Sequence, residues 1–176
     1  MRLNDYKWPA VLIIITFLLG CNSNPRDQSV SPAPEDEIIL IQDLDITTGQ
    51  TIYVPAYSEI YYASEDRTLE LAVTLTIHNT DFEHPIIITS VRYYDTQGQL
   101  VREHLPQPRR LGPLASTDFF VAASQQSGGL GTNFIVEWVA EQPVYEPIVE
   151  TVMLNTSSTQ GVSFTSPGRV IKQLDN

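Results

Sequence analysis

The chain has 176 residues, with 10 Lys and Arg against 21 Asp and Glu, which gives a formal net charge of −11. This length fits one domain. The acidic balance argues against nucleic acid as a partner and against flat adsorption on anionic lipid.

The first twenty residues are typical of a secretory signal peptide. Arg2 and Lys7 flank a polar start, and the apolar run PAVLIIITFLLG then extends from Pro9 to Gly20. About a dozen apolar residues are too few for a transmembrane helix, which needs roughly 20. A basic start with a short apolar core is what secretory signals share. Loss of residues 1–20 would leave 8 basic and 20 acidic residues, a charge of −12.

Cys21 directly follows this run and is the only cysteine in the chain. The tetrapeptide LLGC (18–21) resembles a bacterial lipobox, and the resemblance implies a diacylglyceryl thioether at Cys21, cleavage before it and acylation of the new amino terminus. Two or three acyl chains would make attachment effectively permanent. The alternative is an uncleaved N-terminal anchor helix with an incidental cysteine. A lipidated Cys21 leaves the mature chain without a thiol, and therefore without a disulfide or thiolate chemistry.

We therefore expect a lipid-anchored protein of the cell envelope that faces the periplasm or the extracellular side. Asn22, rather than an aspartate, follows the cysteine, which favours the outer membrane where a cell has two membranes. The lipidated Cys21 begins segment 21–37. The sequence after it, NSNPRDQSVSPAPEDE (22–37), has no apolar periodicity. Its Ser, Pro, Asn and acidic residues are typical of a disordered, flexible tether.

Residues 38–176 are expected to form the folded domain. Its first stretch, IILIQDLDI (38–46), fits either a short strand or a segment that packs beside the domain. The clearest strand is TLELAVTLTIHNT, where apolar residues at 69, 71, 73, 75 and 77 alternate with mostly polar ones. Strict period-two alternation predicts a strand with one buried and one exposed face.

Further strands are predicted over 85–95, 117–123, 134–141 and 148–154, with a last pair in GVSFTS and RVIKQL. The sequence DTQG (95–98) predicts a type I turn followed by a left-handed residue. No segment makes a convincing amphipathic helix. Seven to nine short strands predict an all-β fold, an immunoglobulin-like antiparallel β-sandwich, with a barrel as the alternative.

Two kinds of segment are candidates for binding. The sequence YVPAYSEIYY places Tyr53, Tyr57, Tyr61 and Tyr62 within ten residues, and tyrosine is enriched at interfaces, although some of these side chains could fill the core. SGGLGTN lacks the lysine and helix of a phosphate loop, and its glycines more simply allow positive φ angles. With the loop NTSSTQGVSFTS (155–166), it could offer backbone donors and hydroxyls at one end of the domain. The candidate loop residues are Ser127, Gly128, Gly129, Gly131, Asn133, Ser163 and Thr165.

The segment HNTDFEHP contains the residue types that bind zinc and other divalent ions, namely His78, Asp81, Glu83 and His84. Because His78 ends a strand and the others occupy a turn, a structural role is preferred, and no metal or other cofactor is expected. No G-x-S-x-G elbow is present in the sequence. Acid pairs such as Asp43/Asp45 lie in polar surroundings, which give no reason for a raised pKa. We therefore expect no catalytic residues.

Several stretches together resemble a family of uncharacterised bacterial lipoproteins, domain of unknown function 3124. They are GQTIYVPAYSEIY, LTIHNTD, ITSVRYYDTQGQLVR, LGPLAST, SGGLGTNFIVEW and TQGVSFTSPG, and the resemblance covers about residues 49–170. It implies no activity, substrate or catalytic residue. The hairpin around YYDTQGQLV is also similar to bacterial immunoglobulin-like modules, which concerns the fold alone.

The expected function is that of a membrane-anchored module that binds or scaffolds another envelope protein without catalysis. The alternative is a small-ligand or glycan-binding lipoprotein, which requires a concave pocket near the tyrosines of residues 53–62. A metal-dependent or hydrolytic enzyme built on His78, Asp81 and His84 is the least favoured hypothesis.

Overall fold

The computed structural model describes residues 39–123, 128–157 and 161–175, which belong to one compact unit, Pro34–Asn176. The predicted signal peptide, Cys21 and the tether lie outside the described residues. Among these residues, no helix is long and apolar enough to cross a membrane. The described part contains the 3₁₀ helix η1 (Ile41–Asp43) and twelve strands: β1 (Thr48–Ala56), β2 (Glu59–Tyr62), β3 (Ser64–Glu70), β4 (Ala72–His78), β5 (Ile86–Tyr94), β6 (Leu100–Glu103), β7 (Arg109–Leu111), β8 (Ser116–Val121), β9 (Thr132–Ala140), β10 (Ile148–Asn155), β11 (Val162–Pro167) and β12 (Arg169–Asp175).

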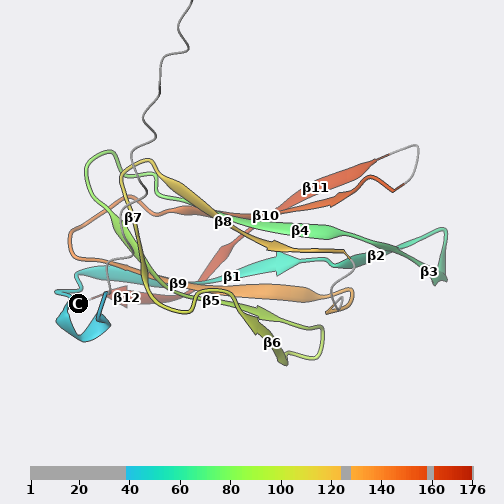
Figure 1. Cartoon of the computed structure of the whole chain (residues 1–176), viewed down its shortest axis with the longest axis horizontal. Helices are drawn as coiled ribbons and strands as arrows, with labels where there is room; N and C mark the ends of the chain where they lie inside the picture. The colour runs from blue at the N-terminus through green and yellow to red at the C-terminus, as the bar shows by residue number, and fades with distance from the viewer. Residues whose placement is uncertain (1–38, 124–127, 158–160, 176) are drawn as a thin grey trace, which may run out of the picture. The chain divides into compact units, whose positions relative to one another are not determined.

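All strands except β2 and β3 form two antiparallel sheets packed face to face (Figure 1). The larger sheet has the order β12-β1-β9-β5-β6, with β7 also paired to β5, and the smaller sheet has the order β11-β10-β4-β8. The predicted all-β antiparallel sandwich is therefore confirmed. The described residues contain more strands than the predicted seven to nine, partly because the short strands β2, β3 and β7 are present as separate elements.

The core lies between the two sheets and is built from the predicted alternation. β4 buries every second side chain, and β8 and β9 do the same from the edge of one sheet and the centre of the other. Each large apolar side chain removed from water contributes about 1.5–3 kcal/mol. The inward residues of these three strands are Val73, Leu75, Ile77, Phe119, Val121, Phe134, Val136 and Trp138.

Strand register gathers the loops at two opposite ends of the sandwich. One end, here called the loop end, is formed by residues 79–85, 112–115 and 141–147, which connect β4 to β5, β7 to β8 and β9 to β10. The other end, here called the arm end, contains the β5–β6 turn, the described glycines before β9 and the connection from β1 to β4. Each long strand therefore links the two ends.

The leading segment, residues 39–47, lies at the loop end on the outer face of the larger sheet. Ile39, Leu44 and Ile46 pack against Ile87 and Val139, which point away from the core. The N–H of Thr47 then donates to the carbonyl oxygen of Ala140 at 2.9 Å, immediately before β1 begins. Of the two alternatives for residues 38–46, packing beside the domain is the one that the structure adopts.

At the arm end, β2 and β3 form a two-stranded ribbon, here called the β2–β3 arm, that pairs with neither sheet among the described residues. β1 leads into β2, and β3 leads into β4, so the arm joins one strand of each sheet (Figure 1). The strand predicted from the alternation between Leu69 and His78 is divided in the structure, because β3 ends at Glu70 and β4 begins at Ala72. The N–H of Leu71 donates to the carbonyl oxygen of Ser58 at 2.8 Å, which fixes the place where the arm leaves the sandwich.

The β5–β6 turn confirms the conformation predicted for DTQG. Gly98 has φ = 76°, and its N–H donates to the carbonyl oxygen of Asp95 at 3.0 Å. The Asp95 side chain also accepts the N–H groups of Gln97 and Gln99, at 2.9 and 2.7 Å. An aspartate that starts the turn and a glycine in the left-handed region together close this hairpin.

Candidate functional site

The four tyrosines of the predicted binding segment occupy three different environments. Tyr53 lies half-buried on the outer face of the larger sheet. Tyr57 directly follows β1 and contacts the ring of Phe164 on β11, with 5.9 Å between ring centroids. Tyr61 and Tyr62 are on the β2–β3 arm and are 55% and 48% exposed. None of the four side chains therefore belongs to the buried core, and only Tyr61 and Tyr62 are exposed on the same strand.

The arm carries a third side chain suited to contact. The guanidinium of Arg67 lies over the ring of Tyr62, 5.9 Å from its centroid. Ile60 and Leu69 anchor the base of the arm because both pack against the core. The side chain of Asn155 adds a hydrogen bond of 2.6 Å to the carbonyl oxygen of Glu70. The arm thus presents two tyrosines and an arginine from a fixed base.

The glycine-rich loop supports the base of the arm. The hydroxyl of Ser58 donates to the carbonyl oxygen of Gly129 at 2.9 Å, and the N–H of Gly129 approaches the same hydroxyl oxygen at 3.2 Å. The hydroxyl of Thr96 donates to the carbonyl oxygen of Gly128 and accepts from the N–H of Gly131. These backbone donors, which the sequence suggested for a ligand, are thus engaged within the chain. Ser127 lies outside the described residues.

A side chain at Gly129 would disturb this arrangement. Its φ of 98° confirms the positive φ angle predicted for the loop. A Cβ at this position would lie 2.5 Å from the hydroxyl oxygen of Thr96, the group that holds Gly128 and Gly131. The glycine is therefore required by both backbone conformation and space.

The remaining loop candidates do not converge with one another. Asn133 lies on the outer face of the larger sheet, opposite Pro55 on β1. Ser163 and Thr165 are exposed on β11, on the outer face of the smaller sheet. Because the inner faces of a sandwich pack together, these two outer faces point in opposite directions. The candidate residues of the two loops therefore do not all meet in one site.

Asp81 and Asn79 form a structural lock at the loop end. The buried Asp81 carboxylate accepts the N–H groups of Glu83 and His84 through Oδ1, at 2.9 and 2.8 Å, and that of Tyr145 through Oδ2 at 3.1 Å. The side-chain amide of Asn79 donates to the carbonyl oxygens of three residues, which are His84, Leu111 and Gly112, at 2.9–3.2 Å. The three loops of this end are thus held together by two polar side chains.

Three of the residues that suggested a metal site, Asp81, Glu83 and His84, take part in these loop contacts. His84 Nδ1 lies 3.4 Å from Asp81 Oδ1, while His78 lies on β4 and faces outward from the smaller sheet. In the part of the chain that the structure describes, no group of three or more His, Cys, Asp or Glu side chains is placed to hold a metal ion. The sequence signal for Asp81 is therefore explained by its backbone partners.

The hydrogen bonds of this lock make Asp81 an acid-sensitive residue. The N–H groups of Glu83, His84 and Tyr145 stabilise its ionised form and lower its pKa from 3.8 to about 2, with a further contribution from the charge of His84. A carboxylate whose pKa is lower in the folded chain stabilises that state above the unfolded pKa, and this stabilisation is lost as pH falls through the folded pKa.

We expect Asp81→Asn to be less stable than the wild type at neutral pH and to lose less stability between about pH 4 and pH 2. An asparagine can accept through one oxygen only, so at least one N–H group of the lock faces its NH₂ group. Urea unfolding across this pH range measures both effects. Asp118→Asn, at an exposed carboxylate of β8, controls for the change in net charge. Parallel curves of unfolding free energy against pH for the wild type and Asp81→Asn would contradict the stabilising role of the ionised Asp81 carboxylate.

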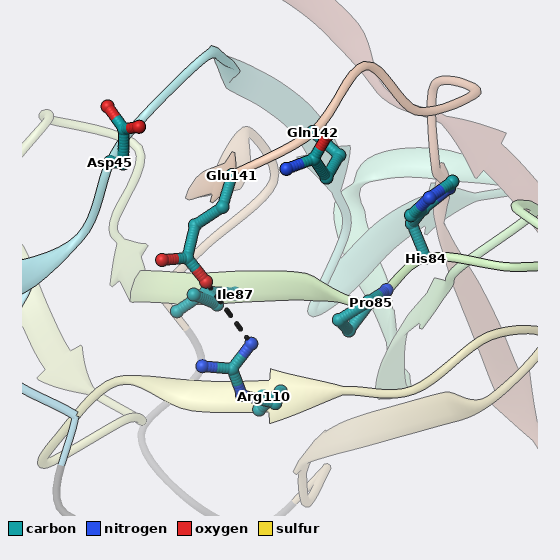
Figure 2. Close-up of a pocket in the computed structure, with 7 residues that line it drawn as sticks. All are labelled: Asp45, His84, Pro85, Ile87, Arg110, Glu141 and Gln142. Carbon is teal, nitrogen blue, oxygen red and sulfur yellow. Dashed lines mark hydrogen bonds and ion pairs between the residues drawn. The ribbon is translucent and has the colours of Figure 1, made fainter.

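Two adjoining depressions lie at the loop end and share His84. The first, here called the charged depression, has a volume of about 300 Å³ and is lined by Asp45, His84, Pro85, Ile87, Arg110, Glu141 and Gln142. Figure 2 shows Glu141 and Arg110 pointing toward one another, with Asp45 on one side and His84 on the other. Their ion pair measures 3.5 Å between Arg110 Nη1 and Glu141 Oε2.

The second depression, here called the apolar groove, has a volume of about 620 Å³. Its walls are Phe82, Pro143, Val144 and Tyr145, together with the polar residues Asp81, Glu83 and His84. The acids and histidines of this stretch suggested a metal site, and neither Phe82 nor Tyr145 was predicted as a functional residue. An aromatic residue within a polar turn, as in TDFEHP, was the available signal. Neither depression is lined by the tyrosine segment.

Comparisons with known proteins give a family match and little more. A family model described as "Protein of unknown function (DUF3124)" matches residues 49–171. No curated protein matches the chain. A solved structure titled "Crystal Structure of Thermotoga maritima 1070" is similar at 13% sequence identity, covering 68% of this chain and 92% of that chain with a TM-score of 0.39.

Proposed function

We propose, on the premise that this chain belongs to the DUF3124 family, that it is a lipid-anchored module of the cell envelope that binds another envelope protein without catalysis. Lipidation of Cys21 comes from the lipobox-like sequence and an outer-membrane location from Asn22, which follows it; both are part of the proposal. The binding surface that we assign is the β2–β3 arm, through Tyr61, Tyr62 and Arg67.

The observation that supports this proposal is the exposure of two tyrosines on a ribbon with a fixed base. Tyrosine and arginine are among the residue types that contribute most of the binding energy at protein interfaces. Tyr61 and Tyr62 have about half of their surface exposed, and Arg67 already stacks on one of them. The Ser58–Gly129 hydrogen bonds and the packing of Ile60 and Leu69 reduce the ordering cost of binding, because the base of the arm is already fixed.

The charge of the arm favours a partner with a basic surface. Glu65 and Asp66 follow the β2–β3 turn directly, and both are exposed. Acidic side chains at the rim of a contact mainly raise the association rate with a positively charged partner. The acidic balance of the whole chain acts in the same direction.

The small-ligand alternative and the enzyme alternative have less support. A glycan or small-molecule site at the tyrosine segment needs a concave surface, whereas the two depressions described above lie at the loop end. A metal or hydrolytic centre on His78, Asp81 and His84 would have to use a carboxylate that is already engaged with three backbone N–H groups.

Photo-crosslinking in the native envelope tests the assignment of the arm. A photoreactive residue at position 61 or 62 should capture one dominant envelope protein, whereas the same residue at Thr165, on the outer face of the smaller sheet, should not. The double variant Tyr61→Ser, Tyr62→Ser should weaken binding of the captured protein by at least about 30-fold, the equivalent of ~2 kcal/mol. Equal capture from both positions would refute the arm as the binding surface.

A further inference from the structure

Three large apolar side chains stand exposed at the loop end although they come from distant parts of the sequence. Phe82, Leu114 and Tyr145 are 73%, 61% and 69% exposed. Asp81 holds their loops together, since its backbone carbonyl oxygen accepts the N–H of Leu114 at 3.1 Å and its carboxylate accepts that of Tyr145 at 3.1 Å. Phe82 directly follows Asp81. A cluster of exposed apolar side chains of this kind marks a contact surface.

The local backbone conformation is unusual at Leu114. Leu114 has φ = 55°, in the left-handed region, which is unfavourable for a residue with a Cβ. Such a conformation persists only where the surroundings impose it, and here the hydrogen bond from Leu114 to Asp81 does so. The exposure of Leu114 is therefore part of the folded structure of the loop end.

The loop end is also the end at which the chain enters the described domain. Asp45, in the leading segment, lines the charged depression together with His84 (Figure 2). Residues 22–38 separate Cys21 from Ile39, the first described residue. The tether that the sequence predicts in this stretch would have a root-mean-square span on the order of 20–25 Å. β9 has nine residues, so the arm end lies about 30 Å further away, at roughly 3.3 Å per residue.

Charge distinguishes between the lipid surfaces that could meet this end. Carboxylates of Asp45, Glu83 and Glu141 border the two depressions, and Arg110, which lines the charged depression, is paired with Glu141. An anionic lipid surface would repel this arrangement, whereas a zwitterionic headgroup layer would not. Aromatic and aliphatic side chains favour the boundary between headgroups and acyl chains.

We infer that the loop end faces the membrane and that Phe82, Leu114 and Tyr145 contact the interfacial region of a zwitterionic lipid bilayer. This inference rests on the proposed lipid anchoring at Cys21. The contact is weak by itself and becomes effective because the anchor holds the loop end at a high local concentration near the surface. The β2–β3 arm then points away from the membrane, toward partners.

The test uses the full-length lipoprotein, purified from membranes and reconstituted in phosphatidylethanolamine–phosphatidylcholine vesicles. An environment-sensitive dye is attached in turn to Phe82→Cys, Tyr145→Cys and, as the control at the arm end, Tyr61→Cys. Spin-labelled lipid should quench the dye at positions 82 and 145 several-fold more than at position 61. Adding phosphatidylglycerol to the vesicles should reduce this difference. The double variant Leu114→Ser, Tyr145→Ser, read from the dye at position 82, should reduce it as well.

Each contrary outcome is informative. Intact mass measurement of the same samples reports lipidation, and a mass without lipid at Cys21 would remove the premise and overturn both the anchoring and the contact. Lipidated protein with equal quenching at all three positions would overturn the contact alone. The dyes at positions 82 and 145 could also report an apolar environment without vesicles, in a way that depends on protein concentration. That result would assign the surface to a second copy of the chain and likewise overturn the inference.

Discussion

Replacing Asn79 with alanine should lower the free energy of unfolding by about 3 kcal/mol, the largest effect expected from a single polar side chain of the loop end. The amide shares its two hydrogens among the carbonyl oxygens of His84, Leu111 and Gly112, and its oxygen accepts the N–H of Asp81 at 3.0 Å. Asn79 is only 2% exposed, so water cannot replace these partners without opening the loops. For a domain of this size the melting temperature should fall by about 10 °C.

Two further variants separate the hydrogen bonds from the shape of the side chain. Asn79→Asp keeps the shape but places an oxygen against three carbonyl oxygens, so it should destabilise at least as strongly as alanine. Asn155→Ala removes the water-accessible hydrogen bonds that this half-buried side chain makes with Glu70 and Ser157 and should cost no more than about 1 kcal/mol. Urea unfolding of the three variants measures the differences. Similar losses for Asn79→Ala and Asn155→Ala would show that Asn79 is not the centre of the lock.

Replacing His104 with phenylalanine should remove much of the loss of stability that accompanies mild acidification. Burial lowers the pKa of His104 from 6.5 to about 4, with a smaller contribution from the charge of Arg102. Its ring lies 5.7–6.4 Å, centroid to centroid, from those of Tyr93, Phe119 and Phe134. Its Nε2 atom is buried and has no hydrogen-bond partner among the described residues. The neutral imidazole therefore behaves as a core side chain.

The direction of the pH effect follows from proton binding. Between pH 6.5 and about 4 the unfolded chain takes up the proton and the folded chain does not, so stability is complete above 6.5 and declines as pH falls toward 4. The decline should amount to about 2–3 kcal/mol for the wild type and be nearly absent in His104→Phe. Denaturant titrations at several pH values measure it.

A second substitution distinguishes titration from packing. Glutamine is polar and does not titrate. His104→Gln should therefore be less stable than His104→Phe at every pH, and in both variants the decline of stability between pH 6.5 and 4 should be nearly absent. If both variants kept the wild-type slope, the acid sensitivity between pH 6.5 and 4 would belong to another group.

Alternation within strands is the part of this fold that a sequence can show. The inward residues of β4, β8 and β9 follow the predicted pattern because each strand obeys period two by itself. The same pattern runs unbroken from Leu69 to Ile77, and so it hides the interruption at Leu71. That interruption depends on a hydrogen bond to Ser58, thirteen residues earlier. A local pattern cannot indicate an interruption whose cause lies in another part of the chain.

The loop end shows the same limit for polar residues. Asn79 and Asp81 are typical turn residues, and the sequence correctly favoured a turn there. Their partners at Leu111, Gly112 and Tyr145 are 32–64 residues away and meet them only once the sandwich has formed. Gly129 is similar, because its positive φ angle is predictable while its contact with Ser58 is not. His104 gave no signal of burial, since its aromatic neighbours come from three other strands.

The direct passage from the leading segment through β1 into the β2–β3 arm has a mechanical consequence. A partner that grips the arm, opposed by an anchor at the other end of the chain, would put β1 under tension along its own length. β1 is bonded on both sides, to β9 and to β12, by antiparallel ladders. β1 is already extended, so the pull would pass along its covalent backbone from one end to the other, and the hydrogen bonds to β9 and β12 would not have to break. β1 would therefore carry the load between the proposed anchor and the proposed binding surface.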